Sequence, residues 1–197
     1  MLSVVSLCNT ALSFLGQTRH IVSLTEASTE ARLCSLCYDK AREGLLCEYP
    51  WRFATMTAAL SELAESSSVW RHVYAVPSGC LFMQKVCAPE DTALKAEPFE
   101  MGRTSSGLAV FTNVQNAVGV YTFSVSDPLE FPPLFAEALA WRLALDLAVP
   151  LTGGKTSLRE HLTQYYINAR TQAMLKDANE FDAPAPVWAQ EYTEARR

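Results

Sequence analysis

The 197-residue chain has no excess of positive charge and no long apolar run. Lys and Arg total 16 against 21 Asp and Glu, and the net charge is -5. Proteins that bind nucleic acid generally use many Lys and Arg to displace counterions, so this balance argues against such a role. No stretch of 18 apolar residues is free of charge, which argues against a membrane span. The apolar N-terminus lacks the cationic lead-in and cleavage site of an export signal, and we expect it to stay as a helix.

Metal and redox signatures are equally sparse. Cys34 and Cys37 form one CxxC pair, but zinc needs four ligands, and neither a second pair nor an HxxxH spacing accompanies them. A redox pair would place its first thiolate at a helix N-terminus, whereas these two fall within an apolar helical pattern. The six cysteines are therefore expected to be free thiols of a reducing compartment that pack as small hydrophobes. We expect no metal and no cofactor.

Two patterns could indicate catalysis, but each lacks features that the corresponding catalytic motif requires. Residues 153–156, Gly-Gly-Lys-Thr, look like a phosphate-binding loop, but that motif needs a glycine where Val149 stands and follows a strand, so a turn between helices is favoured. Pairs that could serve hydrolysis lack a nucleophile elbow or metal spacing. These pairs are Glu97 with Glu100, and Glu160 with His161. We therefore predict a protein that is not an enzyme.

The strongest pattern present is an amphipathic stretch within residues 25–53. Its apolar residues recur at alternating spacings of four and three, which predicts one continuous helical stripe: Ala27, Ala31, Cys34, Tyr38, Ala41 and Leu45. Charged residues take the opposite side: Glu30, Arg32, Asp39, Lys40, Arg42 and Glu43. Capping is expected from Ser23 with Glu26 or from Thr25 with Ser28. Pro50 is expected to end the helix.

The rest of the chain predicts three more helices and four short strands. Helices are expected over residues 3–15, from Pro133 to a stop at Pro150, and from Thr156 or Ser157 onward. Residues 54–65 read as weakly helical or irregular and residues 88–107 as a loop. The strands are expected at 69–76, 80–86, 108–112 and 118–125.

These elements predict an α+β fold that is mainly α: a four-helix bundle with an inserted small antiparallel β lobe and an extended C-terminal tail. The expected division is a single domain over residues 1–178, followed by the tail. Within the domain, the bundle takes residues 1–65 and 129–178, and the β insertion takes residues 69–126. The tail takes residues 179–197.

The tail is the candidate partner-binding segment. It carries Pro184, Pro186 and scattered charges, and its aromatic residues stand alone in a segment that cannot build its own core. Aromatic anchors in such segments often order on contact with a partner; a terminus with incidental aromatics is the alternative. The predicted contact residues are Phe181, Val187, Trp188, Tyr192, Arg196 and Arg197.

A longer series of residues runs in a recognisable order across residues 2–148, with Pro-Trp-x-Phe-Ala after the second helix as its most specific part. The series is Leu15-Gly16, Ile21, Ser23-Leu24-Thr25-Glu26, Ala31, Tyr38-Asp39, Ala41-Arg42, Leu45-Leu46, Pro50-Trp51-Arg52-Phe53-Ala54, Tyr74, Pro77, Cys80-Leu81, Tyr121, Asp127, Phe131, Phe135, Ala138-Leu139-Ala140 and Leu143-Ala144. In this order the chain resembles the tail tubular protein A family, the head-to-tail adaptors of short-tailed bacteriophages.

The resemblance implies a homo-oligomeric ring of twelve copies between a portal protein and a tail nozzle protein. Double-stranded DNA would pass through the channel without specific binding, and the acidic balance suits such a wall. The implied location is the head-tail junction of the virion, after assembly in the host bacterial cytoplasm. Two alternatives from other classes are a virion-associated peptidoglycan hydrolase and a helical binding protein unrelated to virions.

Overall fold

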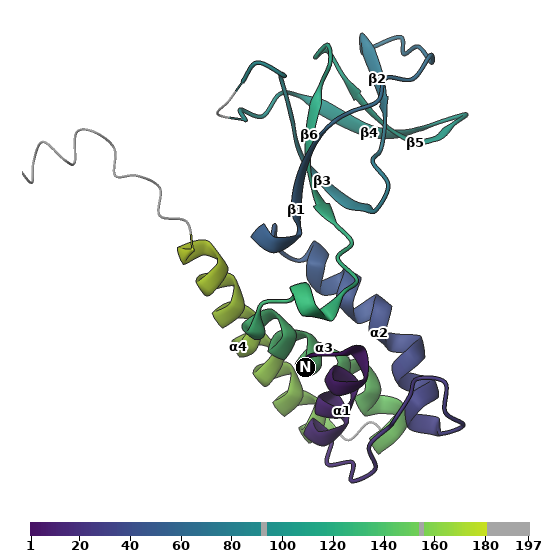
Figure 1. Cartoon of the computed structure of the whole chain (residues 1–197), viewed down its shortest axis with the longest axis vertical. Coiled ribbons are helices and arrows are strands. Elements are labelled where there is room, and N and C mark those ends of the chain that lie inside the picture. Colours follow the sequence, from purple (N-terminus) through teal and green to yellow (C-terminus); the bar gives the residue numbers. More distant parts are fainter. Residues whose placement is uncertain (92–93, 154–155, 181–197) are drawn as a thin grey trace, which may run out of the picture.

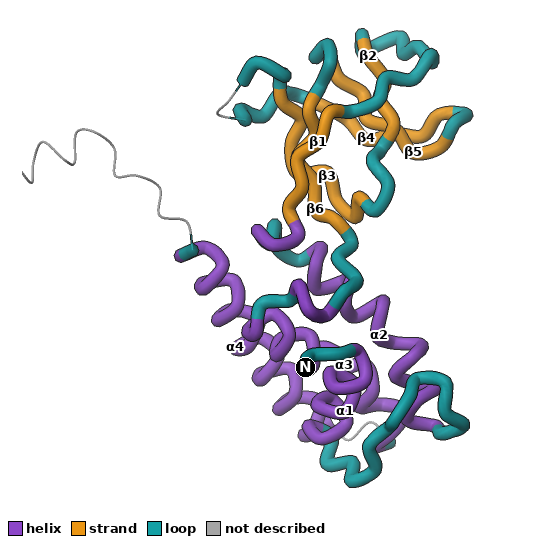
Figure 2. Tube along the Cα trace, viewed as in Figure 1, coloured by secondary structure: helices purple, strands orange, loops and turns teal. Residues whose placement is uncertain are grey.

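The computed structural model describes residues 1–91, 94–153 and 156–180, and there the helices and the strands occupy opposite ends of an elongated molecule (Figures 1 and 2). The helices are α1 (Val4–Phe14), α2 (Thr29–Cys47), α3 (Pro133–Thr152) and α4 (Thr156–Asn179), with short 3-10 turns η1 (Arg52–Ala54) and η2 (Pro128–Glu130). The strands are β1 (Thr55–Ala59), β2 (His72–Ala75), β3 (Cys80–Cys87), β4 (Phe99–Thr104), β5 (Gly107–Thr112) and β6 (Val118–Phe123).

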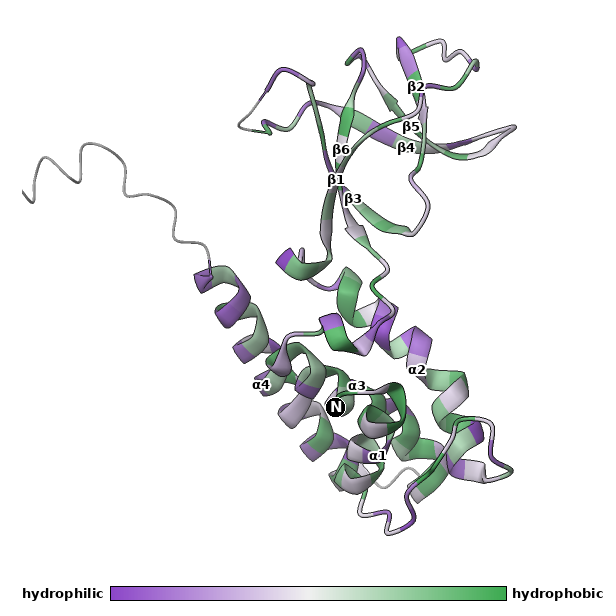
Figure 3. Cartoon of the chain, in the orientation of Figure 1, coloured by the Kyte–Doolittle hydropathy of each residue, from purple (hydrophilic) through white to green (hydrophobic). Residues whose placement is uncertain are grey.

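The helices pack around α3. Helices α1, α2 and α4 each contact α3 extensively, whereas α1 and α2 contact each other little. Helices α1 and α3 are more apolar than α2 and α4 (Figure 3), which suits α3 to the centre. Its buried face includes Phe135, Leu139, Leu143 and Leu147. At about 1.5–3 kcal/mol for each large side chain removed from water, this face accounts for much of the stability of the helical end.

The ends of the helices depart from the sequence expectation in two places. Helix α2 begins after Ser28, whose Oγ accepts a hydrogen bond from the backbone N–H of Ala31 at 3.1 Å. Glu26 instead closes the preceding loop, because its carboxylate accepts from the N–H of Val22 at 2.9 Å. Helix α3 does not stop at Pro150 but continues to Thr152, and Gly153 then takes the left-handed conformation typical of a helix end.

The six strands form two antiparallel three-stranded sheets, ordered β1-β6-β3 and β2-β5-β4. The two sheets are joined on both sides by single bridges, Glu62 to Tyr74 and Val86 to Glu97. Their shared core is small: Leu60, Tyr74, Met83, Val86, Val110, Ala117 and Tyr121. Strands β1 and β4 lie where the sequence pattern indicated irregular structure and a loop, so the lobe has two more strands than expected.

The predicted fold class, a mainly α four-helix bundle with a small β lobe, is wrong. Among the described residues helix accounts for 45% and strand for 21%, so the fold is mixed α+β. The helices are arranged around α3 and do not form a bundle, and the strands form two sheets with a core of their own. We call residues 1–54 and 125–180 the helical module and residues 55–123 the β module.

Candidate interaction surfaces

A buried arginine of the helical module holds the chain that leaves the β module. Arg42 is only 4% exposed, and its guanidinium donates to the backbone O of Val125 at 2.7 Å and to Ser124 Oγ at 3.0 Å. The guanidinium also lies 3.3 Å from Asp39 and 3.1 Å from Glu43, on the same helix. The expectation that Arg42 lies on the charged side, opposite the apolar stripe, is wrong. Arg42 is four residues after Tyr38 and three before Leu45, at the edge of the stripe, and the chain leaving β6 covers this edge.

A second polar cluster ties the end of α2 to α3 and α4. The Glu48 carboxylate accepts hydrogen bonds from Arg142 at 3.0 Å and from Arg170 at 2.7 Å. It also accepts from the hydroxyl of Tyr166 at 2.7 Å, and both guanidinium groups lie over the Tyr166 ring. Burial and the bond to Glu48 raise the pKa of Tyr166 to about 12. Both carboxylate oxygens of Glu48 are used in these contacts, so the cluster fixes the helices against one another.

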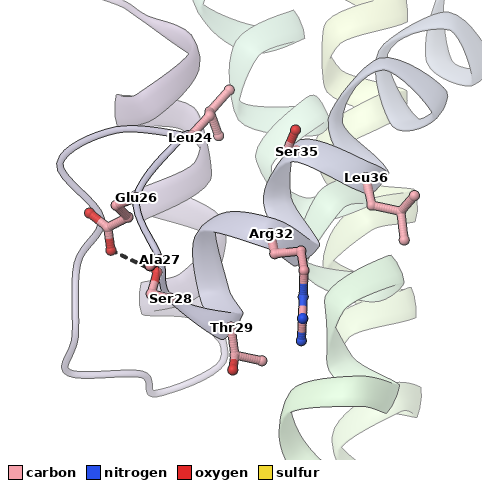
Figure 4. Close-up of a pocket in the computed structure, with 8 residues that line it drawn as sticks. All are labelled: Leu24, Glu26, Ala27, Ser28, Thr29, Arg32, Ser35 and Leu36. Carbon is pink, nitrogen blue, oxygen red and sulfur yellow. Dashed lines mark hydrogen bonds between the residues drawn. The ribbon is translucent and has the colours of Figure 1, made fainter.

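A shallow groove of about 840 Å³ lies at the start of α2 (Figure 4). It is lined by Leu24, Glu26, Ala27, Ser28, Thr29, Arg32, Ser35 and Leu36. Glu26 Oε1 accepts a hydrogen bond from Ser28 Oγ at 2.7 Å, the dashed line in Figure 4, and this bond lowers the pKa of the Glu26 carboxyl. The groove is open to solvent, so its form suits contact with another surface better than enclosure of a small substrate.

A smaller pocket of about 160 Å³ lies where α4 ends. Trp51, Phe135 and the start of α3 form its apolar wall, and Asp177 and Glu180 stand on the α4 side. Asp177 is buried, and both carboxylate oxygens accept from the backbone N–H of Arg52, at 3.1 and 3.3 Å. Burial raises the pKa of Asp177. This contact places the last turn of α4 beside the connection from the helical module to β1.

Helix α4 exposes an unusual share of apolar side chain. Tyr165, Ile167 and Leu175 are 55%, 40% and 59% exposed. Tyr165 also stacks on Trp141, which stacks in turn on Phe14, with ring centroids 4.8 and 3.5 Å apart. Large exposed apolar groups that recur along one element mark surfaces for contact with another protein.

The tip of the β4–β5 hairpin is held by one carboxylate. Glu65 accepts hydrogen bonds from Ser105 Oγ at 2.7 Å, and from the N–H and Oγ of Ser106 at 3.0 and 2.6 Å. These bonds lower the pKa of the Glu65 carboxyl from 4.5 to about 2. Sequence reasoning missed this contact, because 40 residues separate the partners.

We expect the hairpin tip to loosen only in strong acid. A carboxyl whose pKa is lowered in the folded state holds its partners fully above pH 4.5 and loses them as the pH falls through about 2. Between pH 6 and pH 3 the amide resonance of Ser106 should therefore hardly move, and it should shift below pH 3. Glu65→Gln, which has no carboxylate to protonate, should abolish that shift. A midpoint near 4.5 for Ser106 in the unaltered protein would contradict the contact.

The residues considered for chemistry do not converge in the described part of the chain. Cys34 is buried and Cys37 half-buried, and burial raises the pKa of the Cys37 thiol, as expected for packed thiols. No group of three or more His, Cys, Asp or Glu in residues 1–91, 94–153 and 156–180 is placed to hold a metal. Gly154 and Lys155 lie outside the described residues, as do all six predicted contact residues: Phe181, Val187, Trp188, Tyr192, Arg196 and Arg197.

No protein-family model matches the chain, and no curated protein matches it significantly. Among the described helices, none is both long enough and apolar enough to cross a membrane.

Proposed function

We propose that this chain is a structural head-to-tail connector of a bacteriophage virion. Copies form a ring, of twelve subunits if the resemblance holds, between the portal protein and the tail nozzle protein. The proposal originates in the sequence resemblance over residues 2–148. The structural observation that supports it best is the exposure of Ile167 and Leu175 on α4, two apolar side chains that are free to contact a neighbouring copy.

The shape of the subunit is compatible with this role. A ring subunit needs a stiff body and two ends that differ, because the components above and below it differ. Here the Arg42 and Glu48 contacts fix the helices and the linkage to β6, and the β module projects from one end (Figure 1). In the proposed connector the helical module makes the lateral contacts and the β module meets the nozzle.

The proposed portal contact uses the C-terminal segment, which begins at the end of α4. Its residues are those given above: Phe181, Val187, Trp188, Tyr192, Arg196 and Arg197. The net charge of -5 favours a channel wall along which DNA slides without adhering. No catalytic step is part of the proposal.

The test is assembly on isolated portal rings, followed by electron microscopy and sedimentation. The full chain should bind portal rings in a stoichiometry of one copy for each portal subunit. Replacing Ile167 and Leu175 together with Glu should reduce the fraction of decorated portals at least tenfold, because charges would be buried between neighbours. Both side chains are exposed in the monomer, so its helix content and melting temperature should hardly change.

Two further variants make the test specific. Val69→Glu places the same charge on a side chain that is 76% exposed in the β module, and it should leave portal decoration unchanged. Deletion of residues 179–197 should leave a folded monomer that no longer docks. Full decoration by the α4 variant would remove α4 from the ring contact, and undiminished docking by the truncated chain would remove the tail from the portal contact. A full-length protein that stays monomeric beside portal rings would overturn the proposed function.

A further inference from the structure

Strand β1 has one open edge, and its unpaired backbone groups can be assigned. In the sheet ordered β1-β6-β3, β1 pairs with β6 in regular antiparallel register. The N–H of Leu60 donates to the O of Ala117 at 2.8 Å and continues that register. Because antiparallel pairs alternate between bonded and non-bonded, the backbone groups of Thr57 and Ala59 point away from β6.

Further along the chain this same edge is already used. The O of Ser61 accepts from the N–H of Ala75, and the N–H of Leu63 donates to the O of Val73, both at 2.8 Å. Strand β2 therefore covers the edge beside residues 61–63. It then turns away at Pro77, after its last residue, and leaves the backbone of residues 57–59 uncovered by any described strand.

The uncovered part of β1 also lacks the features that protect edge strands. Natural edges carry charges, prolines or bulges that prevent pairing with other strands. Edge strand β4 carries Glu100 and Arg103, and edge strand β3 carries Lys85 and two register shifts. Strand β1, Thr-Met-Thr-Ala-Ala, carries neither charge nor proline, and its register is regular. An edge of this kind favours the addition of another strand.

The end of the described chain lies close to this edge. The carboxylate of Asp177 bonds to the N–H of Arg52, three residues before β1, and Glu180 lines the pocket that Trp51 closes. The described chain therefore ends, at Glu180, near the residues that lead into β1. Residues 181–186, which include Pro184 and Pro186, reach about 20 Å when extended, more than the length of a five-residue strand.

The sequence beyond these prolines has the composition of a strand. Residues 187–193 read Val-Trp-Ala-Gln-Glu-Tyr-Thr, a run without Gly or Pro in which four of seven residues are β-branched or aromatic. A short linker also gives the segment an effective concentration of the order of mM at the edge. We propose that residues 187–193 of the same chain add to β1 as a further strand, bonded to the backbone of Thr57 and Ala59.

This inference does not depend on the phage role, because it concerns one molecule alone. It assigns the isolated chain a resting position for the segment that holds Val187, Trp188 and Tyr192. It also gives a reason for the unprotected edge, since a strand covered by its own chain needs no other protection.

Amide hydrogen exchange on the full-length monomer tests the inference. Residues 187–193 should exchange at least tenfold more slowly than in a synthetic peptide of residues 181–197, and the amide of Ala59 should also be protected. Gln190→Pro removes an amide from the centre of the added strand, so residues 187–193 and the amide of Ala59 should both lose their protection from exchange. Ala195→Pro lies outside the segment and should leave both protected. Thr57→Pro removes an outward N–H without a bond to β6, and it should release residues 187–193 while the β6 amides stay protected.

The outcomes decide between the possible occupants. Protection that is independent of protein concentration, in a monomer by light scattering, supports pairing within one chain. Protection that rises with concentration together with a dimer mass would overturn it in favour of a second copy. Exchange of residues 187–193 at the peptide rate would overturn it altogether, as would an Ala59 amide that stays protected in Gln190→Pro. The segment variants do not touch the described core, so the test remains decisive even if Thr57→Pro fails to fold.

Discussion

Replacing Arg42 with methionine is expected to lower the free energy of unfolding by about 2–4 kcal/mol. Methionine has a similar length but no donors, so the backbone O of Val125 would remain buried without its 2.7 Å partner. Little of the loss would come from the ion pair with Asp39, whose side chain is 75% exposed. The measurement is equilibrium unfolding in urea, followed by far-ultraviolet circular dichroism.

Two companion variants show which property of Arg42 matters. Arg32→Met removes the same group from an exposed position of the same helix and should change the free energy of unfolding by less than about 0.5 kcal/mol. Arg42→Lys keeps the charge but has a single nitrogen, whereas one nitrogen of Arg42 bonds Val125 and Ser124 and another bonds Asp39 and Glu43, so it should recover only part of the loss. If Arg42→Met cost no more than Arg32→Met, the link between α2 and the end of β6 would not contribute to stability.

Arg42 also shows why the sequence predicts the helices but not the way the modules join. The spacing of Ala31, Cys34, Tyr38 and Ala41 identifies the buried stripe of α2 correctly, and all four side chains are buried. A helical pattern records only which residues share a face. It contains nothing about the chain segment 82 and 83 residues later, Ser124 and Val125, that covers the edge of this stripe at Arg42. Charged residues that serve such contacts are therefore assigned to solvent.

The strands were harder to predict for a different reason. In β1 and β4 neither face is fully buried, and side chains alternate poorly between apolar and polar. Period-two patterning, the main sequence signal for a strand, is therefore absent. Strand β6 has four buried residues among its six and was predicted at its true start. The count of strands, and with it the fold class, was wrong where burial was slight.

For the candidate site, too, the sequence predicts only features that a local pattern records. The prediction for the tail residues rests on composition alone, and these residues lie outside the described part of the chain. The features it adds are the open edge of β1, the exposed face of α4 and the Glu65 contact. Each depends on which element lies next to which, so no local pattern in the sequence identifies it.

Trp51→Ala is expected to lower the free energy of unfolding by about 3–5 kcal/mol. Trp51 is 1% exposed, and its ring meets those of Phe135 and Tyr49 edge-on, at centroid distances of 5.1 Å each. Its Nε1 donates to the backbone O of Leu45 at 2.9 Å, a carbonyl in the last turn of α2 that also accepts from the N–H of Glu48 at 3.3 Å. One side chain thus closes the end of α2, contacts α3 and precedes β1.

Phenylalanine at position 51 separates the packing of the ring from the hydrogen bond. Trp51→Phe keeps most of the apolar contact but loses the bond to Leu45, and it should cost about 1–2 kcal/mol. Trp70→Phe is the matched control: its Nε1 also donates, at 3.0 Å, but to the exposed carboxylate of Glu100, so its loss should cost less than about 0.5 kcal/mol. Equal costs for the two phenylalanine variants would mean that the Leu45 bond contributes nothing beyond a solvent-exposed one. A cost below about 1.5 kcal/mol for Trp51→Ala would mean that the junction is held mainly by other contacts, such as the bonds of Arg42 and Glu43 to Ser124.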